Sequence, residues 1–258
     1  MEIHKPKAAH SWGEFLIEIG TIICGILIAL GLEQGIEWLH WHEQVHLTEE
    51  ALLPEIQSNL TNIAERISVR PCQSQQIITL RDALLAPGEV WRAPPYPAVA
   101  GKPNPGLADV ADGSWMGPGS GGPIPRIYRV PHRPWPDAAY RSALAAGVFN
   151  HMSGDRARLY GGLYYGFSLL KDFQEVEFGT IPHLTRLGFD GRLTPQERSA
   201  YVNTLGEMDN IDRFMASSGA QLIIKADKAG IRVKRSQIES RPFSRLACRA
   251  KVVFPTEN

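Results

Sequence analysis

The chain has little cysteine and no excess of charge of either sign. Three cysteines in 258 residues are too few for the disulfide-framed scaffold of a small secreted toxin or growth factor. Lysine plus arginine and aspartate plus glutamate each number 27, so the basic excess of a dedicated nucleic-acid binder is missing. We therefore predict no nucleic-acid partner. Hydrophobic residues make up 43% of the chain, which excludes disorder of the chain as a whole.

A recognisable catalytic set is also missing. No Ser/His/Asp or Cys/His group can be assigned to one site from the sequence. The glycine-rich stretch 117–122 lacks both the Gly-Lys-Ser/Thr ending of a phosphate loop and a strand before it. The sequence thus predicts no catalytic residue and no cofactor, and it favours a non-enzymatic role. Clear alternating strands are missing as well, which predicts a mainly α fold.

One long apolar run lies near the amino terminus, at residues 15–32. Eleven of these 18 residues are Ile, Leu or Phe, and residues 19–32 carry no charge. As a helix the run spans about 27 Å, close to the ~30 Å hydrocarbon core of a bilayer. Trp12 and Trp38 flank it about 39 Å apart on one helix, near the spacing of the two membrane interfaces. We predict a transmembrane helix over residues 12–38.

Two other interpretations of the run remain open. It can be a buried core helix, or it can be a signal peptide, because Ala29-Leu30-Gly31 has the small-residue spacing of a cleavage site. Glu14 and Glu18 argue against a signal peptide, since its first region is normally positive.

Flanking charge predicts the orientation of the span. Lys5 and Lys7 precede it, whereas residues 33–67 contain seven glutamates and one arginine. Because basic flanks stay in the cytoplasm, residues 1–11 are expected there and the remainder on the outer side.

The predicted helix runs on past the membrane. In residues 39–86 apolar positions recur at three- and four-residue steps, as in an amphipathic helix. Pro54 should kink this helix or start a new segment, and Pro71 should end it, with a second helix over residues 72–85. We expect a juxtamembrane helical hairpin.

Residues 87–136 differ from the rest in composition. They contain 12 prolines and 8 glycines, through which a helix cannot propagate. Five aromatic residues in the same stretch predict a partly ordered loop laid over a scaffold, with a mobile centre near residues 113–122. These aromatic residues are Trp91, Tyr96, Trp115, Tyr128 and Trp135.

Helices are predicted again in residues 137–258. The first covers residues 137–152, and Ser153 can cap the second. Thr194-Pro195-Gln196-Glu197 has the pattern of a capping box and predicts a third helix that reaches about Asp227. A short extended segment is expected at residues 251–254.

Small residues recur within the span. Gly31-x-x-x-Gly35 and Gly25-x-x-x-Ala29 allow two membrane helices to approach closely, which predicts a homo-oligomer. The alternative is that glycine is simply common in membrane helices.

His42-Glu43-Gln44-Val45-His46 has the formal H-E-x-x-H pattern of zinc proteases. In such enzymes the two histidines bind zinc and the glutamate activates its water. Here the segment directly follows the span, and no third-ligand motif comes after it. We therefore commit to no metal site, and keep His42, His46 and Glu43 as the residues of an alternative, a membrane-tethered zinc hydrolase.

Cysteine placement agrees with an exported domain. Cys24 lies within the span, and Cys72 and Cys248 are the two outside it. In an oxidising compartment these two are expected to form one disulfide that closes a loop of about 175 residues. The alternative is two unpaired buried thiols.

The amino-terminal part resembles a group of uncharacterised bacterial single-span membrane proteins of unknown function. The resemblance rests on a Lys-Pro…His-Ser-Trp start (Lys5 to Trp12), an apolar Ala-Leu-Gly span and a Glu-Trp…Trp continuation (Glu37 to Trp41). It covers about the first 60 residues and implies a membrane anchor, but no activity. Together with the flanking charge, we expect a bacterial inner-membrane protein with a cytoplasmic N-terminus and a periplasmic C-terminal region. We expect a membrane-anchored helical protein that acts in binding, sensing or envelope scaffolding, with the lipid bilayer and an unknown protein as partners.

Overall fold

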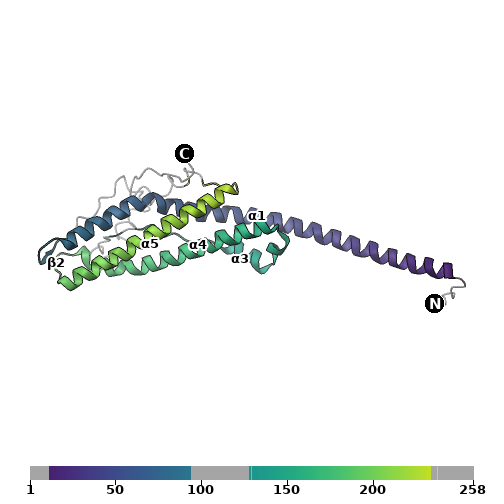
Figure 1. Ribbon diagram of the computed structural model, residues 1–258, viewed down its shortest axis with the longest axis horizontal. Helices are drawn as coiled ribbons and strands as arrows, with labels where there is room; N and C mark the ends of the chain where they lie inside the picture. Colours follow the sequence, from purple (N-terminus) through teal and green to yellow (C-terminus); the bar gives the residue numbers. More distant parts are fainter. Residues whose placement is uncertain (1–11, 94–127, 129, 234–236, 238–258) are drawn as a thin grey trace, which may run out of the picture.

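The protein is a helical bundle from which one long helix projects, as seen in the computed structural model (Figure 1). The structure describes residues 12–93, 128, 130–233 and 237. The described N-terminal end lies at the tip of the projecting helix, far from the bundle (Figure 1). The mainly α fold expected from the sequence is confirmed.

Helix α1, Trp12–Leu85, joins the projecting rod and the bundle without interruption. Its 74 residues correspond to a length of about 110 Å. The end predicted at Pro71 is wrong: Pro54 and Pro71 both lie inside the helix, so the two helices of the expected hairpin are one. A proline inside a helix costs about 3 kcal/mol. Burial on both sides of Pro71, by Val69, Ile77 and Leu80, offsets this cost.

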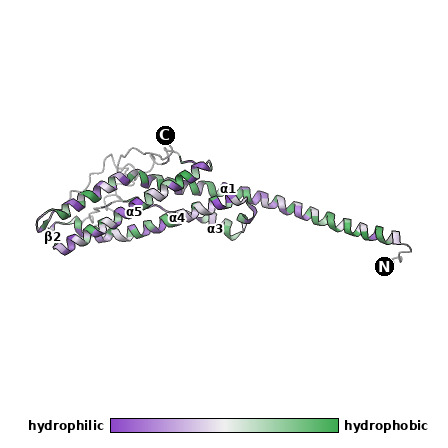
Figure 2. Cartoon of the chain, in the orientation of Figure 1, coloured by the Kyte–Doolittle hydropathy of each residue, from purple (hydrophilic) through white to green (hydrophobic). Residues whose placement is uncertain are grey.

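The projecting part of α1 is mainly apolar, with polar turns among the apolar ones (Figure 2). None of its most apolar 18-residue window is buried in the protein, so the core-helix interpretation is wrong for this structure. By length and composition this helix can cross a membrane or serve as a signal anchor. The Thr21 hydroxyl donates to the Ile17 and Glu18 carbonyls at 3.0 and 2.8 Å, so this polar group is satisfied within the helix.

Two further long helices complete the bundle. Helix α4, Gly154–Thr180, runs parallel to α1, and helix α5, Pro195–Lys228, returns antiparallel between them and packs against both (Figure 1). The contact between α5 and α1 is close at Gly219, where a Cβ would lie 2.5 Å from Cγ2 of Ile63. Any larger residue there would force the two helices apart.

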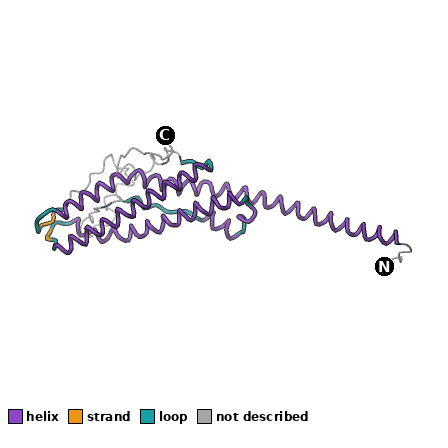
Figure 3. The backbone as a smooth tube through the Cα atoms, in the orientation of Figure 1, coloured by secondary structure: helices purple, strands orange, loops and turns teal. Residues whose placement is uncertain are grey.

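Short elements connect the long ones (Figure 3). Strands β1, Val90–Trp91, and β2, Gly191–Arg192, pair antiparallel at the far end of the bundle. The 3₁₀ helix η2, Ile181–Gly188, links α4 to β2.

The helix predicted over residues 137–152 is interrupted. Helix α3 covers only Ala138–Ala145, and the 3₁₀ helix η1, Val148–His151, follows it. Gly147 separates them with φ = 72°, in the left-handed region that favours glycine. This break turns η1 toward α1 at the near end of the bundle.

The local prediction for α5 is confirmed. Thr194 is its N-cap and accepts a hydrogen bond from the Glu197 amide, while the Glu197 carboxylate accepts from the Thr194 amide, which completes a capping box. The helix ends at Lys228, one residue beyond the predicted end.

Both described ends of the proline-rich stretch lie on the bundle. Trp91, Tyr128 and Trp135 are buried, in agreement with the prediction that its aromatic residues pack on a scaffold. The predicted mobile centre at residues 113–122 and the extended segment at residues 251–254 lie outside the described residues.

The bundle interior consists of two hydrophobic clusters. The near cluster joins α1, α4 and α5 through residues such as Ile56, Leu163 and Ile223. The far cluster includes Leu84, Trp91 and Leu205. Buried polar and charged side chains lie between the two clusters in sequence on all three helices: Glu65, Arg66 and Gln73 on α1, Gln174 and Glu177 on α4, and Asp212 on α5.

Candidate functional site

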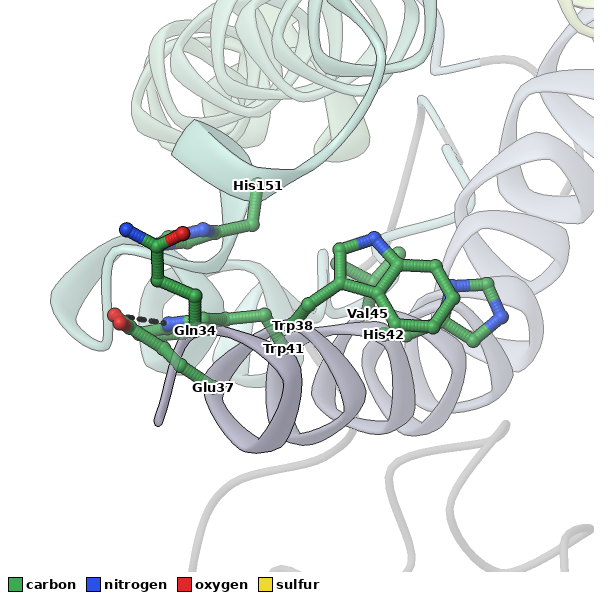
Figure 4. A pocket seen from close by; sticks show the side chains of 7 residues that line it. All are labelled: Gln34, Glu37, Trp38, Trp41, His42, Val45 and His151. Carbon is green, nitrogen blue, oxygen red and sulfur yellow. Dashed lines mark hydrogen bonds between the residues drawn. The ribbon is translucent and has the colours of Figure 1, made fainter. Parts of the chain in front are cut away.

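A pocket of about 310 Å³ lies where the projecting part of α1 meets the bundle (Figure 4). It begins within one turn of the end of the apolar run. Six of its residues come from α1 and one from η1. They are Gln34, Glu37, Trp38, Trp41, His42, Val45 and His151.

Stacked rings shape this pocket. The His151 imidazole lies flat on the Trp41 indole, with ring centroids 3.6 Å apart and an interplanar angle of 7°. Trp38 stacks on His42 with centroids 5.4 Å apart. Figure 4 shows Gln34 beside His151 and the Trp41 indole N–H directed at the Glu37 carboxylate, which accepts it at 3.4 Å. The pocket therefore combines aromatic rings, imidazoles, an amide and one carboxylate.

The H-E-x-x-H segment lies on the exposed surface of α1. His42 stacks on Trp38, and the His46 Nδ1 lies 3.6 Å from the Glu50 carboxylate. Within the described residues, no group of three or more His, Cys, Asp or Glu side chains is arranged to hold a metal ion. The histidines of the pattern are thus engaged in a ring stack and in a surface contact with the Glu50 carboxylate.

A second group of charged side chains is buried in the middle of the bundle. The Arg66 guanidinium donates to the Glu177 carboxylate at 2.6 Å and to the Asp212 carboxylate at 3.0 Å. Tyr128 donates its hydroxyl to the other oxygen of Asp212. One cation, two carboxylates and a phenol from four parts of the chain therefore meet in the core.

The environment shifts the proton affinities of this cluster. Burial raises the pKa of Glu177 to about 7; Arg66 opposes this shift and the nearby Asp212 adds to it. Burial lowers the pKa of Arg66, but the two carboxylates outweigh burial and raise it above its ordinary value. Burial, followed by Asp212, raises the pKa of Tyr128 well above its ordinary value. These groups are enclosed by the helices and do not line the pocket.

A row of polar side chains on α1 forms hydrogen bonds with the end of the proline-rich stretch. The side-chain amides of Asn59 and Asn62 donate to the Pro136 and Pro134 carbonyls at 2.8 and 2.7 Å. Glu65 accepts two hydrogen bonds, of 2.8 and 2.7 Å, from the Arg133 guanidinium. Since proline offers a carbonyl but no amide hydrogen, donors at three-residue spacing on α1 suit this segment.

A larger groove of about 590 Å³ lies at the far end of the bundle. It lies between the end of α1 and the start of α5, with Leu85, Pro87 and Val202 among its apolar residues. Arg198 donates to the Leu84 carbonyl at 2.9 Å and so satisfies the last turn of α1. The guanidinium of Arg198 in this groove is therefore used to hold the end of α1.

The cysteines are placed as follows. Cys24 is free and exposed on the projecting part of α1. Cys72 lies on α1 within the bundle, and Cys248 lies outside the described residues. The Cys72–Cys248 disulfide stays a prediction.

Sequence reasoning missed His151 and the Arg66 cluster. His151 joins the pocket from a position 110 residues after Trp41 along the chain, and Arg66 pairs with groups 111 and 146 residues away. Both Glu65 and Arg66 are buried, although neither lies on the apolar stripe that the sequence predicts for α1, so no local signal marked them.

Comparison of the chain with protein-family models, with curated proteins and with solved structures finds no match. The site is therefore interpreted from its own chemistry.

Proposed function

We propose that the protein is a non-enzymatic, membrane-anchored scaffold that holds a three-helix bundle at the outer face of a bacterial inner membrane. The observation that carries this proposal is the continuity of α1, in which an unburied apolar helix leads without a break into the bundle core. A hinge-free connection fixes the height and direction of the bundle relative to the bilayer. Such control of position is what a scaffold or sensor requires.

The charge pattern supports an outward-facing bundle. Lys5 and Lys7 precede the span, and the first 35 residues after the apolar run contain seven glutamates and one arginine. The amino terminus is then cytoplasmic and the bundle periplasmic.

The chemistry of the interior supports a binding role over catalysis. The buried Arg66–Glu177–Asp212 cluster is enclosed by three helices, and the described residues that line the two pockets do not include it. A catalytic acid or base must reach its substrate, whereas a buried ion cluster acts on packing and stability.

Membrane fractionation of the full-length chain tests this proposal. We expect the protein to stay in the membrane pellet after alkaline carbonate washing and to require detergent for extraction. A C-terminal alkaline phosphatase fusion should be active, and a C-terminal green fluorescent protein fusion exported by the general secretion route should be dark. Release of the intact chain into the soluble fraction would contradict anchoring, and the opposite reporter pattern would contradict the orientation.

A further inference from the structure

We propose that the pocket around Trp38 and Trp41 binds the ammonium-bearing headgroup of a zwitterionic phospholipid, ethanolamine or choline. The proposal rests on the proposed membrane anchoring of α1. It assigns a specific ligand class to a site at the base of the bundle.

The first argument is depth in the membrane. The headgroup layer on each side of a bilayer is about 5–7 Å thick, the difference between the hydrocarbon core and the full bilayer. At 1.5 Å per residue, Gln34 lies about 3 Å and Glu37 about 8 Å beyond Leu32, the last residue of the apolar run. Gln34 therefore lies in the headgroup layer and Glu37 lies at its outer edge, where the ammonium end of a headgroup is found. The upper rim, at His42 and Val45, lies about 15–20 Å beyond Leu32 and so outside the layer.

The second argument is the chemistry of the lining. Aromatic faces and a carboxylate are the groups that bind ammonium ions, through cation–π attraction and charge. Trp38 is 64% exposed and has His42 stacked against it at 5.4 Å, so much of the indole remains open to a ligand. The Glu37 carboxylate lies next to Trp41, whose N–H it accepts, and supplies the countercharge.

The third argument is the sign of the local charge. The lining contains one carboxylate and neither lysine nor arginine. An anionic headgroup such as glycerol phosphate is disfavoured here, whereas a headgroup that ends in an ammonium is attracted. The Gln34 amide and the imidazole N–H groups offer donors for the phosphate next to that ammonium.

A role for η1 follows from the same geometry. His151 covers one face of Trp41 at 3.6 Å and thereby fixes the orientation of the indole. Because η1 belongs to the folded bundle, a headgroup bound in the pocket contacts the anchor and the bundle together. Lipid binding would then hold the bundle upright on the membrane.

Calorimetric titration of the full-length protein in a nonionic detergent tests the proposal. The probes are dihexanoyl-phosphatidylethanolamine, dihexanoyl-phosphatidylcholine and dihexanoyl-phosphatidylglycerol, which differ in headgroup but share their acyl chains. We expect Kd for at least one of the first two to be about tenfold lower than Kd for the third. Equal Kd values for all three would overturn the proposal.

Matched variants separate the site from general effects. Glu37→Gln should weaken binding of the ammonium lipid about tenfold, whereas Glu33→Gln, the same charge change outside the pocket, should leave it unchanged. Trp38→Leu should weaken binding about fivefold, while Trp12→Leu at the other end of the span should not. An unchanged Kd in Glu37→Gln, or equal losses in a variant and its control, would contradict the proposal.

Two further binding measurements distinguish a lipid from a soluble ligand. Free phosphocholine and phosphoethanolamine should bind more weakly than the lipids, and inorganic phosphate should not compete. Binding of the free compounds as tight as that of the lipids would assign the site to a soluble ammonium compound and overturn the lipid proposal. Carbonate washing of the same variants keeps the two proposals apart, because Glu37→Gln should remain membrane-bound whether or not its pocket has lost the headgroup.

Discussion

At the scale of single residues, the feature with the largest consequence is the buried carboxyl of Glu177. It lies within 2.6 Å of the Arg66 guanidinium and shares that cation with Asp212. Burial disfavours the ionised form of Glu177, and the second carboxylate, Asp212, adds to this effect although Arg66 opposes it, so the pKa of Glu177 is raised in the folded protein.

This shift predicts a pH dependence of stability. The pKa of Glu177 rises from 4.5 to about 7 on folding, so the folded state binds the proton more tightly than the unfolded chain. The free energy of unfolding should therefore fall as pH rises from about 4.5 to about 7, by on the order of 3 kcal/mol from this group. Glu177→Gln, which cannot ionise, should remove this part of the decline. Urea unfolding at several pH values in detergent measures it.

The control for this prediction is Arg66→Met. Removal of the cation leaves Glu177 and Asp212 buried without a countercharge and should cost about 3–5 kcal/mol at pH 8. If Glu177→Gln and the wild type keep the same difference in stability at pH 5 and pH 8, the raised pKa is wrong.

The residue scale also shows the limit of sequence reasoning. Arg66 was visible as one charge on a predicted amphipathic helix, but its partners lie on two helices far along the chain. No local pattern encodes which distant carboxylates a buried arginine meets.

At the scale of elements, the prediction succeeded where the determinants are local. The start of α5 follows from four adjacent residues, Thr194 to Glu197, and the capping box is present as expected. The Pro71 break failed for the opposite reason, because tertiary packing on both sides of the proline outweighs its local cost.

The α5 cap gives a prediction at this scale. Thr194→Ala removes the side-chain acceptor of the Glu197 amide and should lower the free energy of unfolding by about 1 kcal/mol. Thr204→Ala serves as the matched control, because its hydroxyl bonds the Ala200 carbonyl inside the same helix and alanine favours helix there. Chemical denaturation of both variants measures the difference. Equal effects would show that the cap contributes nothing specific.

At the scale of the whole molecule, α1 determines the shape. One helix of 74 residues is both the projecting rod and a member of the bundle, so the orientation of the bundle depends on the rod (Figure 1). The pocket at residues 34–45 lies at this junction, and η1 is the part of the bundle that closes it.

Membrane insertion should be sensitive to charge in the rod. The apolar run favours insertion by several kcal/mol, and a lysine at the centre of a span costs about 3 kcal/mol. Ile26→Lys should therefore shift a measurable fraction of the chain out of the carbonate-resistant membrane fraction. Ile36→Lys lies beyond the apolar run and should leave the distribution unchanged. Equal behaviour of the two variants would show that residues 15–32 are not the anchor.

The sequence by itself determined the features that depend on neighbouring residues: the apolar run, the proline-rich interruption, the cap of α5 and the mainly helical class. Apolar run length, turn residues and capping spacing act over a few residues and need no knowledge of the fold. The tertiary structure alone decided that α1 continues through Pro71, that Arg66 meets Glu177 and Asp212, and that His151 covers Trp41. Each of these depends on packing between segments far apart in the chain, where burial and charge pairing outweigh local preference.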